Sequence, residues 1–354
     1  MRDAVVNIKS QSGEGERPVL IIYTGGTMGM TYDISGSLSP FDFENIFHEM
    51  PVLESMGLAI TVVSFSDPID SSNVTVEHWN KLAAIIKKNY QDYYGFVVLH
   101  GTDTLAYSAS VLSFMLEGLA KPVIFTGSQL PIGAVRTDAT QNLIAALQIA
   151  SSSGSSGPQV REVCIYFDYF LYRGNRCKKV ESTHFDAFES ENYPPLAELG
   201  ITIDYNFSAF KKTVSNGLFT VHSLRSVQLA VLKLFPGLSQ SYLDHVLQTP
   251  GLQGIIMETF GSGNAPTSTW FIEAITEAIA NDIIIFNVSQ CNGGRFIQGR
   301  YATSKQLQKA GVISGDDITT EAALAKMQFL FSNYPGNDQI EALLATPLRG
   351  EMSH

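Results

Sequence analysis

Residues 19–27 read VLIIYTGGT, an apolar run that passes directly into two glycines flanked by threonines. A second stretch, residues 96–104, repeats the arrangement as FVVLHGTDT. Short apolar runs that end in glycine are typical of strands buried on both faces of a parallel sheet. Ligands of open α/β sheets bind beyond the carboxyl ends of the strands. We therefore expect both threonine-glycine segments to lie at one edge of a sheet and to form a small polar pocket suited to attack by a hydroxyl.

Strand and helix patterns alternate around these two stretches. The apolar runs predict strands at residues 19–23, 59–65, 96–99, 122–125 and 163–167. The helical periodicities predict helices at residues 75–90, 103–119 and 138–150. This βαβ alternation favours an α/β fold in which a doubly wound, mostly parallel sheet has helices on both faces. We assign residues 1–205 to this larger N-terminal α/β domain.

Residues 206–226 interrupt the alternation, because this segment is largely polar, has no clear period and contains Asn216-Gly217. Such a segment is typical of an inter-domain linker. The alternation resumes with predicted strands at residues 228–234, 254–257 and 283–288 and helices at residues 239–247, 268–280, 304–310 and 319–331. We assign residues 227–354 to a smaller C-terminal α/β domain, and a chain of 354 residues is long enough for two domains.

The composition excludes several classes of protein. A net charge of −11 argues against a nucleic-acid partner, since phosphate binding needs a basic face. No apolar run reaches membrane-spanning length, and the polar residues 1–15 lead us to expect no secretory signal. The cysteines are Cys164, Cys177 and Cys291, without a CxxC pair, so we expect a reduced cytoplasmic protein without structural zinc. The histidines show no metal-binding spacing and the chain has no Walker loop, so we expect neither a metal nor another cofactor.

Thr27 and Thr102 are the candidate nucleophile and its partner. A threonine hydroxyl is inert at neutral pH until a base or a cation assists it. Asp103 follows Thr102 at the start of a predicted helix, where a carboxylate is favoured, although a plain N-cap explains it equally well. Lys179, in the turn-rich stretch YRGNRCKK at residues 172–179, is the candidate base or proton carrier. Lysines in such stretches are also typical of a solvated surface.

A third strand end carries the sequence DSSN at residues 70–73. The hydroxyls of Ser71 and Ser72 could hold the carboxylate and amine of a ligand. The alternative interpretation is a turn that caps the following helix. His100 precedes a glycine at a strand end, and we expect it to pack behind the pocket.

Together these segments resemble the bacterial-type L-asparaginases, closest to the cytoplasmic type I group. The motifs are YTGGTMGM at residues 23–30, LHGTDT at 99–104, LYRGNR at 171–176, GNAP at 263–266 and YAT at 301–303. The resemblance extends from Val19 nearly to the C-terminus. It implies hydrolysis of L-asparagine to L-aspartate and ammonia without a cofactor. It also implies a cytoplasmic homotetramer, a dimer of intimate dimers in which each active site is completed by a neighbouring subunit.

The resemblance also implies residue roles. Thr27 lies on a mobile loop and attacks the side-chain amide carbon of asparagine. Thr102, Asp103 and Lys179 form a second triad, in which Lys179 carries charge or protons. Thr102 either activates water or assists the first attack, and the sequence leaves both roles open.

Substrate contacts follow from the same resemblance. Asp103 would meet the α-amine of asparagine, and Ser71 and Ser72 would meet its α-carboxylate. Backbone amides near residues 101–103 would hold the oxyanion. Asn264 would approach the pocket of a neighbouring subunit, or else it simply forms a Gly-Asn turn.

Two positions depart from the family pattern. Many members have a tyrosine on the mobile loop where an ungapped alignment places Ser37, and Tyr32 is out of register. Tyr301, from the second domain, is a candidate substitute. Members that are activated by asparagine have an arginine where this chain has Glu258, so we do not expect that kind of activation.

Three alternatives to a dedicated asparaginase remain. One is a glutaminase-asparaginase of dual specificity, because one methylene changes binding only modestly. Another is the amidase subunit of a tRNA-dependent amidotransferase. That subunit needs an added N-terminal domain, and we expect the residues before Val19 to be too few to form one. The last is a non-catalytic module that binds amino acids. The combination of two threonines with Asp103 and Lys179 argues against it.

Overall fold

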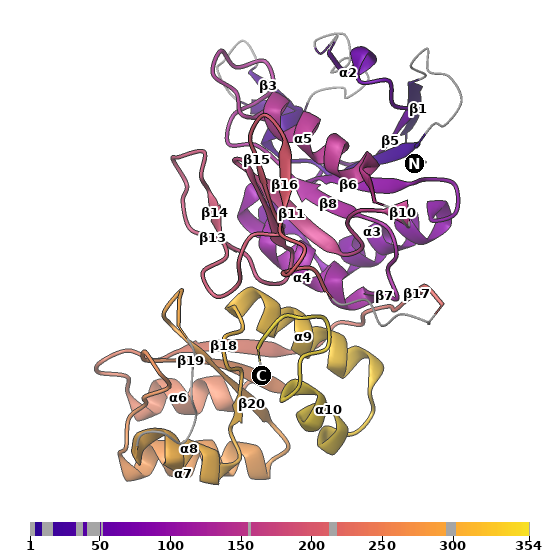
Figure 1. The fold of residues 1–354 in the computed structure, drawn as a ribbon. Helices are drawn as coiled ribbons and strands as arrows, with labels where there is room; N and C mark the ends of the chain where they lie inside the picture. Colours follow the sequence, from indigo (N-terminus) through magenta and orange to yellow (C-terminus); the bar gives the residue numbers. More distant parts are fainter. Residues whose placement is uncertain are drawn as a thin grey trace. The chain divides into compact units, whose positions relative to one another are not determined.

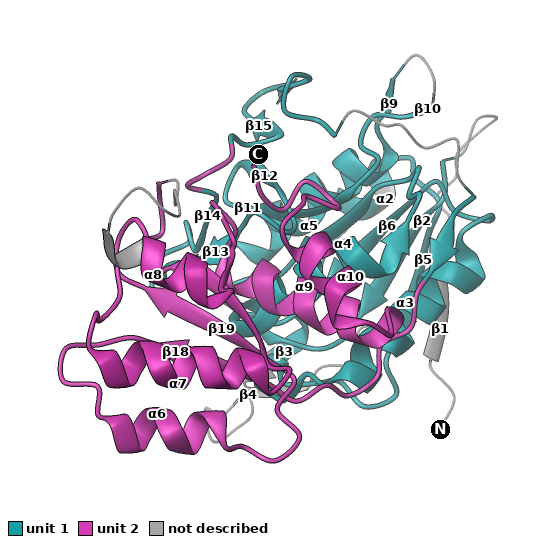
Figure 2. Cartoon of the chain, turned by 90° about the horizontal axis from the view of Figure 1, so that it is seen from below, with its two compact units in different colours: residues 1–190, 194–221 teal, residues 191–193, 222–354 magenta. Residues whose placement is uncertain are grey.

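The computed structural model describes residues 4–8, 17–32, 38–40, 50, 52–154, 157–211, 218–294 and 302–353. The chain forms two compact units, coloured separately in Figure 2. Unit 1 comprises Met1–Ser190 and Pro194–Val221, and unit 2 comprises Glu191–Tyr193 and His222–His354. The main division therefore falls within residues 206–226, and three residues between two strands of unit 1 group with unit 2.

In the described part of the chain, unit 1 is built on a nine-stranded sheet (Figure 1). In spatial order the strands are β1 (Ala4–Ile8), β5 (Ile60–Ser64), β2 (Val19–Tyr23), β6 (Gly95–Leu99), β8 (Val123–Thr126), β11 (Val163–Phe167), β12 (Phe170–Arg173), β15 (Ala197–Leu199) and β16 (Ile203–Tyr205). The five strands from β5 to β11 are parallel. β1, β12, β15 and β16 each pair antiparallel with their neighbours. The predicted mostly parallel sheet is confirmed.

The central strands are covered on both faces, as their continuous apolar sequences require. Every residue of β2, β6, β8 and β11 is buried. Figure 1 shows α5 (Ala139–Ser151) on one side of the sheet, and α3 (Val76–Asn89) and α4 (Leu105–Met115) on the other. This arrangement of helices on two faces is typical of doubly wound folds.

The helix predicted at residues 103–119 is wrong at both ends. It opens as a 3₁₀ turn, η4 (Thr102–Thr104), and α4 ends at Met115. The chain then enters the short strand β7 (Leu116–Glu117), which pairs with β17 (Thr220–Val221). A positive φ of 69° at Gly118 follows, a conformation that suits glycine and not a continuing helix.

The order of the parallel strands reverses beside β2. The chain runs from β2 to β5 on one side and then returns to place β6 on the other side of β2. A reversal of this kind is a topological switch point, and ligands of open α/β sheets bind in the crevice beyond it. The two threonine-glycine segments follow β2 and β6, so they lie at this position.

Short elements complete unit 1. They are η1 (Thr27–Gly29), β3 (Met30–Tyr32), β4 (Leu38–Pro40), α2 (Val52–Ser55), η3 (Ser71–Asn73), β9 (Ser153–Gly154), β10 (Gly157–Pro158), β13 (Lys178–Lys179) and β14 (Phe188–Glu189). The last two pair with each other as an antiparallel hairpin.

Unit 2, again among the described residues, has a four-stranded parallel sheet in the order β18 (Leu229–Lys233), β19 (Gly254–Thr259), β20 (Ile284–Ser289) and β21 (Ile313–Ser314). Its helices are α6 (Gln240–Leu247), α7 (Thr269–Ala280), α8 (Ala302–Ala310), α9 (Thr320–Asn333) and α10 (Asn337–Leu344). In Figure 1, α6, α7 and α8 lie on one face of this sheet, and α9 and α10 lie on the other. The predicted α/β character of this part is confirmed, although α10 was not predicted.

A buried ion pair fixes α10 and the residues after it. Lys326, in the middle of α9, is fully buried and forms a 2.8 Å ion pair with Glu351. Its ammonium also donates to the carbonyl oxygens of Leu344 at 2.9 Å and Thr346 at 2.6 Å. Because these partners satisfy all three donors of the ammonium, the charge is tolerated in the core. The end of α10 is thereby held on α9.

Candidate active site

Glycines allow the carboxyl ends of β2, β5 and β6 to meet. Gly26 has a φ of 94°, and a Cβ atom there would lie 2.5 Å from the backbone of Gly101. A Cβ atom on Gly101 would lie 2.6 Å from the Oγ of Ser71. These approaches are closer than any side chain permits, so they require glycine. They bring the segments that carry Thr27, Thr102 and Ser71 together at the edge of the sheet.

The hydroxyls of two other threonines in these segments donate hydrogen bonds to backbone carbonyl oxygens. Thr24 donates from its hydroxyl and its amide to the carbonyl oxygen of Leu99, at 2.9 and 3.0 Å. Thr104 donates to the carbonyl oxygen of Ser71 at 2.7 Å. Both hydroxyls therefore hold the strand ends together. Thr27, which is half-buried at the start of η1, has no such partner among the residues that the structure describes.

Thr102, Asp103 and Lys179 form one hydrogen-bonded cluster. The ammonium of Lys179, on β13, donates to Oγ1 of Thr102 at 2.7 Å and to Oδ1 of Asp103 at 2.8 Å. The side chain of Lys179 is only 18% exposed, whereas that of Asp103 is 67% exposed. A cation against a hydroxyl oxygen stabilises the oxyanion that forms when the proton leaves. The cluster therefore has the chemistry of an activated hydroxyl.

Both structural alternatives for these residues are wrong. The N-caps at this point are Gly101 for the 3₁₀ turn and Thr104 for α4, so Asp103 is not a plain cap. Its carboxylate instead contacts Lys179. That lysine is not a solvated surface charge, because its ammonium is bonded to two neighbouring side chains.

Gln129 joins the cluster and was missed from the sequence. The Thr102 hydroxyl donates to its Oε1 at 3.4 Å, and its Nε2 donates to the carbonyl oxygen of His184 at 3.0 Å. Asp138 fixes the backbone of Gln129, whose amide donates to Oδ2 of the carboxylate at 2.9 Å. Burial raises the pKa of Asp138, although these hydrogen bonds oppose the rise. The sequence TGSQ at residues 126–129 was the available signal, since it is a third strand end with glycine and hydroxyls.

The two serines at the end of β5 have different surroundings. Ser71 is buried against Gly101. Ser72 is exposed, and its amide and hydroxyl both donate to Oδ1 of Asp70 at 2.9 Å. Asp70 thus caps the 3₁₀ turn η3, so the turn part of that interpretation is right. The helix that follows, α3, is capped by Thr75 and not by this segment.

The remaining candidates lie in unit 2 or outside the described residues. Asn264 closes a tight turn after β19, where its backbone and that of Phe260 exchange hydrogen bonds of 2.9 Å. Glu258, on β19, accepts a 2.6 Å hydrogen bond from the hydroxyl of Thr320. Tyr301 and Ser37 lie outside the described residues.

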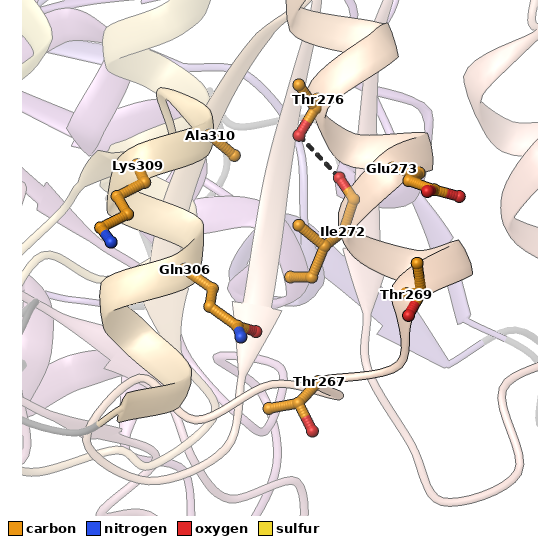
Figure 3. A pocket seen from close by; sticks show the side chains of 8 residues that line it. All are labelled: Thr267, Thr269, Ile272, Glu273, Thr276, Gln306, Lys309 and Ala310. Carbon is orange, nitrogen blue, oxygen red and sulfur yellow. Dashed lines mark hydrogen bonds between the residues drawn. The ribbon is translucent and has the colours of Figure 1, made fainter.

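Unit 2 contains a pocket of about 370 Å³ between α7 and α8 (Figure 3). Its lining residues are Thr267, Thr269, Ile272, Glu273, Thr276, Gln306, Lys309 and Ala310. The Thr276 hydroxyl donates to the carbonyl oxygen of Ile272 at 2.7 Å, which is an ordinary helix contact. None of the candidate catalytic residues lines this pocket, so it is not the site described above.

The described residues contain no group of three or more histidine, cysteine, aspartate or glutamate side chains that could hold a metal ion. Among the same residues, no helix has both the length and the apolar character needed to cross a membrane.

Comparisons with known proteins give a consistent result. The family description "Asparaginase, N-terminal" matches residues 18–211, and "Glutaminase/Asparaginase C-terminal domain" matches residues 228–344. L-asparaginase 1 of Escherichia coli K12 is 38% identical over 347 residues, which cover 96% of this chain and 98% of that protein. The 60 kDa lysophospholipase of Mus musculus is 39% identical over 364 residues. This chain spans 63% of the length of the mouse protein.

A solved structure agrees with the sequence comparisons. L-asparaginase I of Vibrio cholerae superposes with a TM-score of 0.88 at 37% sequence identity, covering 96% of this chain and 100% of that one. The family matches cover most of both units, and the two threonine-glycine segments follow β2 and β6 directly. The chain therefore belongs to the asparaginase family.

Proposed function

We propose that this chain is an L-asparaginase that hydrolyses the side-chain amide of L-asparagine to L-aspartate and ammonia, with Thr27 as the nucleophile. The observation that carries the proposal is the contact of the Lys179 ammonium with both the Thr102 hydroxyl and the Asp103 carboxylate. The close approach of Gly26 to Gly101 supports it, since it brings the Thr27 segment against this cluster.

The reaction proceeds through two acyl-transfer steps. The Thr27 oxygen adds to the amide carbon while the carbonyl electron pair moves onto oxygen, and the proton of the hydroxyl passes to the amide nitrogen. Collapse of this intermediate breaks the C–N bond, releases ammonia and leaves an aspartyl ester on Thr27. Water then adds to the ester and regenerates the Thr27 hydroxyl as L-aspartate departs. Asparagine and water thus give aspartate and ammonia, with no other reactant.

Thr102 and Lys179 serve one of these additions. The Thr102 hydroxyl relays a proton: its oxygen takes the proton of the attacking group while its own proton passes to the group that leaves. The Lys179 ammonium, 2.7 Å from that oxygen, stabilises the charge on it during the transfer. Thr102 either activates the hydrolytic water or assists the attack by Thr27. Both assignments use the same contact, and both place Lys179 as the group that balances charge.

The surroundings of the cluster suit a small amino acid. The Asp103 carboxylate is exposed and bound only on its Lys179 side among the described contacts, so it can accept the α-ammonium of asparagine. The hydroxyls of Ser71 and Ser72 would receive the α-carboxylate. We include Tyr301 and Asn264 as substrate contacts from unit 2, with Asn264 approaching the pocket of a neighbouring subunit in a homotetramer formed as a dimer of intimate dimers.

A cytoplasmic location completes the proposal. Cys164 and Cys177 are buried, Cys291 is exposed, and none of the three forms a disulfide. An exposed free thiol is typical of proteins kept in a reducing compartment.

Ammonia release from L-asparagine and from L-glutamine, measured side by side, tests the proposal. We expect turnover of asparagine, a strong preference over glutamine, and no change on treatment with EDTA. Comparable turnover of both substrates would favour the dual glutaminase-asparaginase, which the description of the C-terminal family match also names. Tight binding of aspartate with no ammonia from either amide would favour the non-catalytic module. Inactivation by EDTA with recovery on addition of zinc would contradict a cofactor-free reaction.

A further inference from the structure

Three side chains form a continuous hydrogen-bonded chain behind the Thr102 segment. The indole nitrogen of Trp79, on α3, lies 2.9 Å from the Oγ of Ser108, on α4. That oxygen lies 2.9 Å from Nε2 of His100, and Nδ1 of His100 lies 2.8 Å from the carbonyl oxygen of Gly101. Ser108 is fully buried and His100 is 4% exposed, so water does not compete for these contacts. The proposed reaction uses none of these three side chains directly.

The chemistry of the three groups fixes the direction of every proton. An indole N–H can only donate, so the Ser108 oxygen accepts from Trp79. The Ser108 hydroxyl proton is then left to donate to Nε2 of His100, which must accept it. A neutral imidazole that accepts at Nε2 carries its proton on Nδ1. The Nδ1–H therefore donates to the carbonyl oxygen of Gly101. Burial lowers the pKa of His100 to about 4, so the ring is neutral at pH 7.

This bond sets the orientation of one peptide group. In a trans peptide the carbonyl and the following N–H point in opposite directions, and no described peptide bond of the chain is cis. Because the Gly101 carbonyl points at His100, the Thr102 N–H points away from the imidazole. Thr102 also begins the helical segment, so its amide has no acceptor within the helix. Because glycine has unusual backbone freedom, the peptide between Gly101 and Thr102 could adopt several orientations, and the hydrogen bond from His100 holds it in one.

We propose that His100 is a positioning residue, held in one tautomer by Ser108 and Trp79, that aims the Thr102 amide at the oxyanion formed from the substrate amide. The inference rests on the proposed function, because the oxyanion arises only when a hydroxyl adds to that amide. Its effect is on the transition state and not on the bound substrate. Loss of one aligned oxyanion donor costs roughly 10²–10³ in kcat.

Truncation of Ser108 tests the chain with little change in volume. Ser108→Ala removes the donor that selects the tautomer, and we expect kcat to fall at least about tenfold while KM changes less than twofold. Ser110→Ala is the matched control, since Ser110 is equally buried on α4 but its hydroxyl contacts the carbonyl oxygen of Gly174. Equal kcat values in the two variants would overturn the inference.

Two substitutions of His100 separate its two nitrogens. Asparagine places an N–H donor near the position of Nδ1, whereas glutamine places one near Nε2. We expect His100→Asn to retain clearly more kcat than His100→Gln, and the reverse order would overturn the inference. Thermal unfolding and circular dichroism check the fold of each variant. If neither His100 variant folds, the comparison of Ser108→Ala with Ser110→Ala decides.

Nitrogen-15 NMR of the histidine-labelled protein reads the tautomer directly. At pH 7 we expect the two ring nitrogens of His100 to give the resonances of a protonated Nδ1 and an unprotonated Nε2. Ser108→Ala should shift these resonances, and Ser110→Ala should leave them unchanged. A wild-type His100 protonated on Nε2 would overturn the inference. A wild-type protein that releases no ammonia from asparagine would defeat the proposed function instead, and this readout distinguishes the two failures.

Discussion

The hydroxyl groups at the strand ends differ in what they already bond. Thr24 and Thr104 donate to backbone carbonyls, so replacing them should cost stability. Thr102 instead accepts a hydrogen bond from an ammonium group, and Thr27 opens the neighbouring 3₁₀ turn. Hydroxyls that donate to backbone carbonyl oxygens therefore stabilise the fold, whereas the hydroxyls of Thr27 and Thr102 are those that we propose to react.

Removal of either reactive hydroxyl should nearly abolish turnover. We expect Thr27→Ala and Thr102→Val each to lower kcat for asparagine by several powers of ten, because each loses a nucleophile or its activating partner. Thr126→Val is a suitable control, since the buried Thr126 hydroxyl donates to the carbonyl oxygen of Tyr166. It should lose about 1 kcal/mol of stability and keep its kcat. Near-normal turnover by a folded Thr102→Val protein would contradict the triad assignment.

Lys179 and Asp103 should affect different stages of the reaction. Lys179→Met should be inactive yet bind L-aspartate, because the ammonium is assigned to charge and proton transfer. Asp103→Ala should lose both turnover and binding, since the α-ammonium of the ligand then lacks its carboxylate partner. Calorimetric titration with aspartate measures both affinities. The role given to Asp103 is wrong if its alanine variant binds as tightly as the wild type.

His100 should make folding stability depend on pH. Its pKa is about 4 in the folded protein because burial disfavours the imidazolium, whereas the value in the unfolded chain is near 6.5. Between these values the unfolded chain binds the extra proton, so stability falls as pH decreases from about 6.5 to about 4. The loss is on the order of 3 kcal/mol. Urea unfolding at pH 7.0 and pH 4.5 should show a smaller loss in His100→Asn than in the wild type, and equal losses would exclude His100 as the source.

At the scale of elements, the site depends on how closely strand ends can approach. Three parallel strands deliver their loops to one edge of the sheet, and glycine backbones remove the side chains that would keep these loops apart. The hairpin of β13 and β14 then brings Lys179 to the same edge. The parallel sheet thus sends these loops to the same edge, and the glycines allow the loops to approach each other closely.

Gly26→Ala should damage catalysis through this proximity. The new Cβ atom would lie 2.5 Å from the Gly101 backbone, so one of the two loops must move. A displacement of about 1 Å at a catalytic group can cost roughly 100-fold in rate, and we expect a loss of kcat of that order. Gly237→Ala is the control, because Gly237 has a similar φ of 87° but no atom within 4 Å of the added Cβ. It should lose stability and keep its kcat, and equal kcat losses in both variants would exclude the steric explanation.

At the scale of the whole molecule, Glu258 bears on regulation. The family resemblance places it where we expect asparagine-activated members to have an arginine. It is held by the Thr320 hydroxyl at 2.6 Å, and Lys233 lies at 4.0 Å. A carboxylate here repels the carboxylate of an effector. We expect the rate to depend hyperbolically on asparagine concentration, with a Hill coefficient near one, while light scattering shows a tetramer.

A sigmoidal rate curve from the purified tetramer would contradict this expectation. It would indicate that another basic residue, such as Lys178 or Arg295, binds the effector. Glu258→Arg is the variant to compare, since it introduces the charge that the resemblance assigns to asparagine-activated members. Its curve should become sigmoidal if the rest of the effector site is present.

The fold class and the family could be predicted from the sequence alone, because the signals for both are local. Continuous apolar runs predict β2, β6 and β11, and the polar threonine-glycine segments follow them directly along the chain. The family motifs are contiguous as well, and the family comparisons confirm the resemblance. The roles of Thr27, Thr102, Asp103 and Lys179 stay predictions, although the structure brings the last three within hydrogen-bonding distance.

Other features depend on residues that are distant in the sequence, and only the tertiary structure decided them. Gln129 reaches Thr102 because β8 lies beside β6. Trp79, Ser108 and His100 meet because α3 and α4 pack on the same face of the sheet. Lys326 is buried because Glu351 and two carbonyl oxygens satisfy its charge, and its helical position alone does not reveal that partner. Hydrogen bonds and burial are properties of neighbours in space, whereas a sequence pattern records only neighbours along the chain.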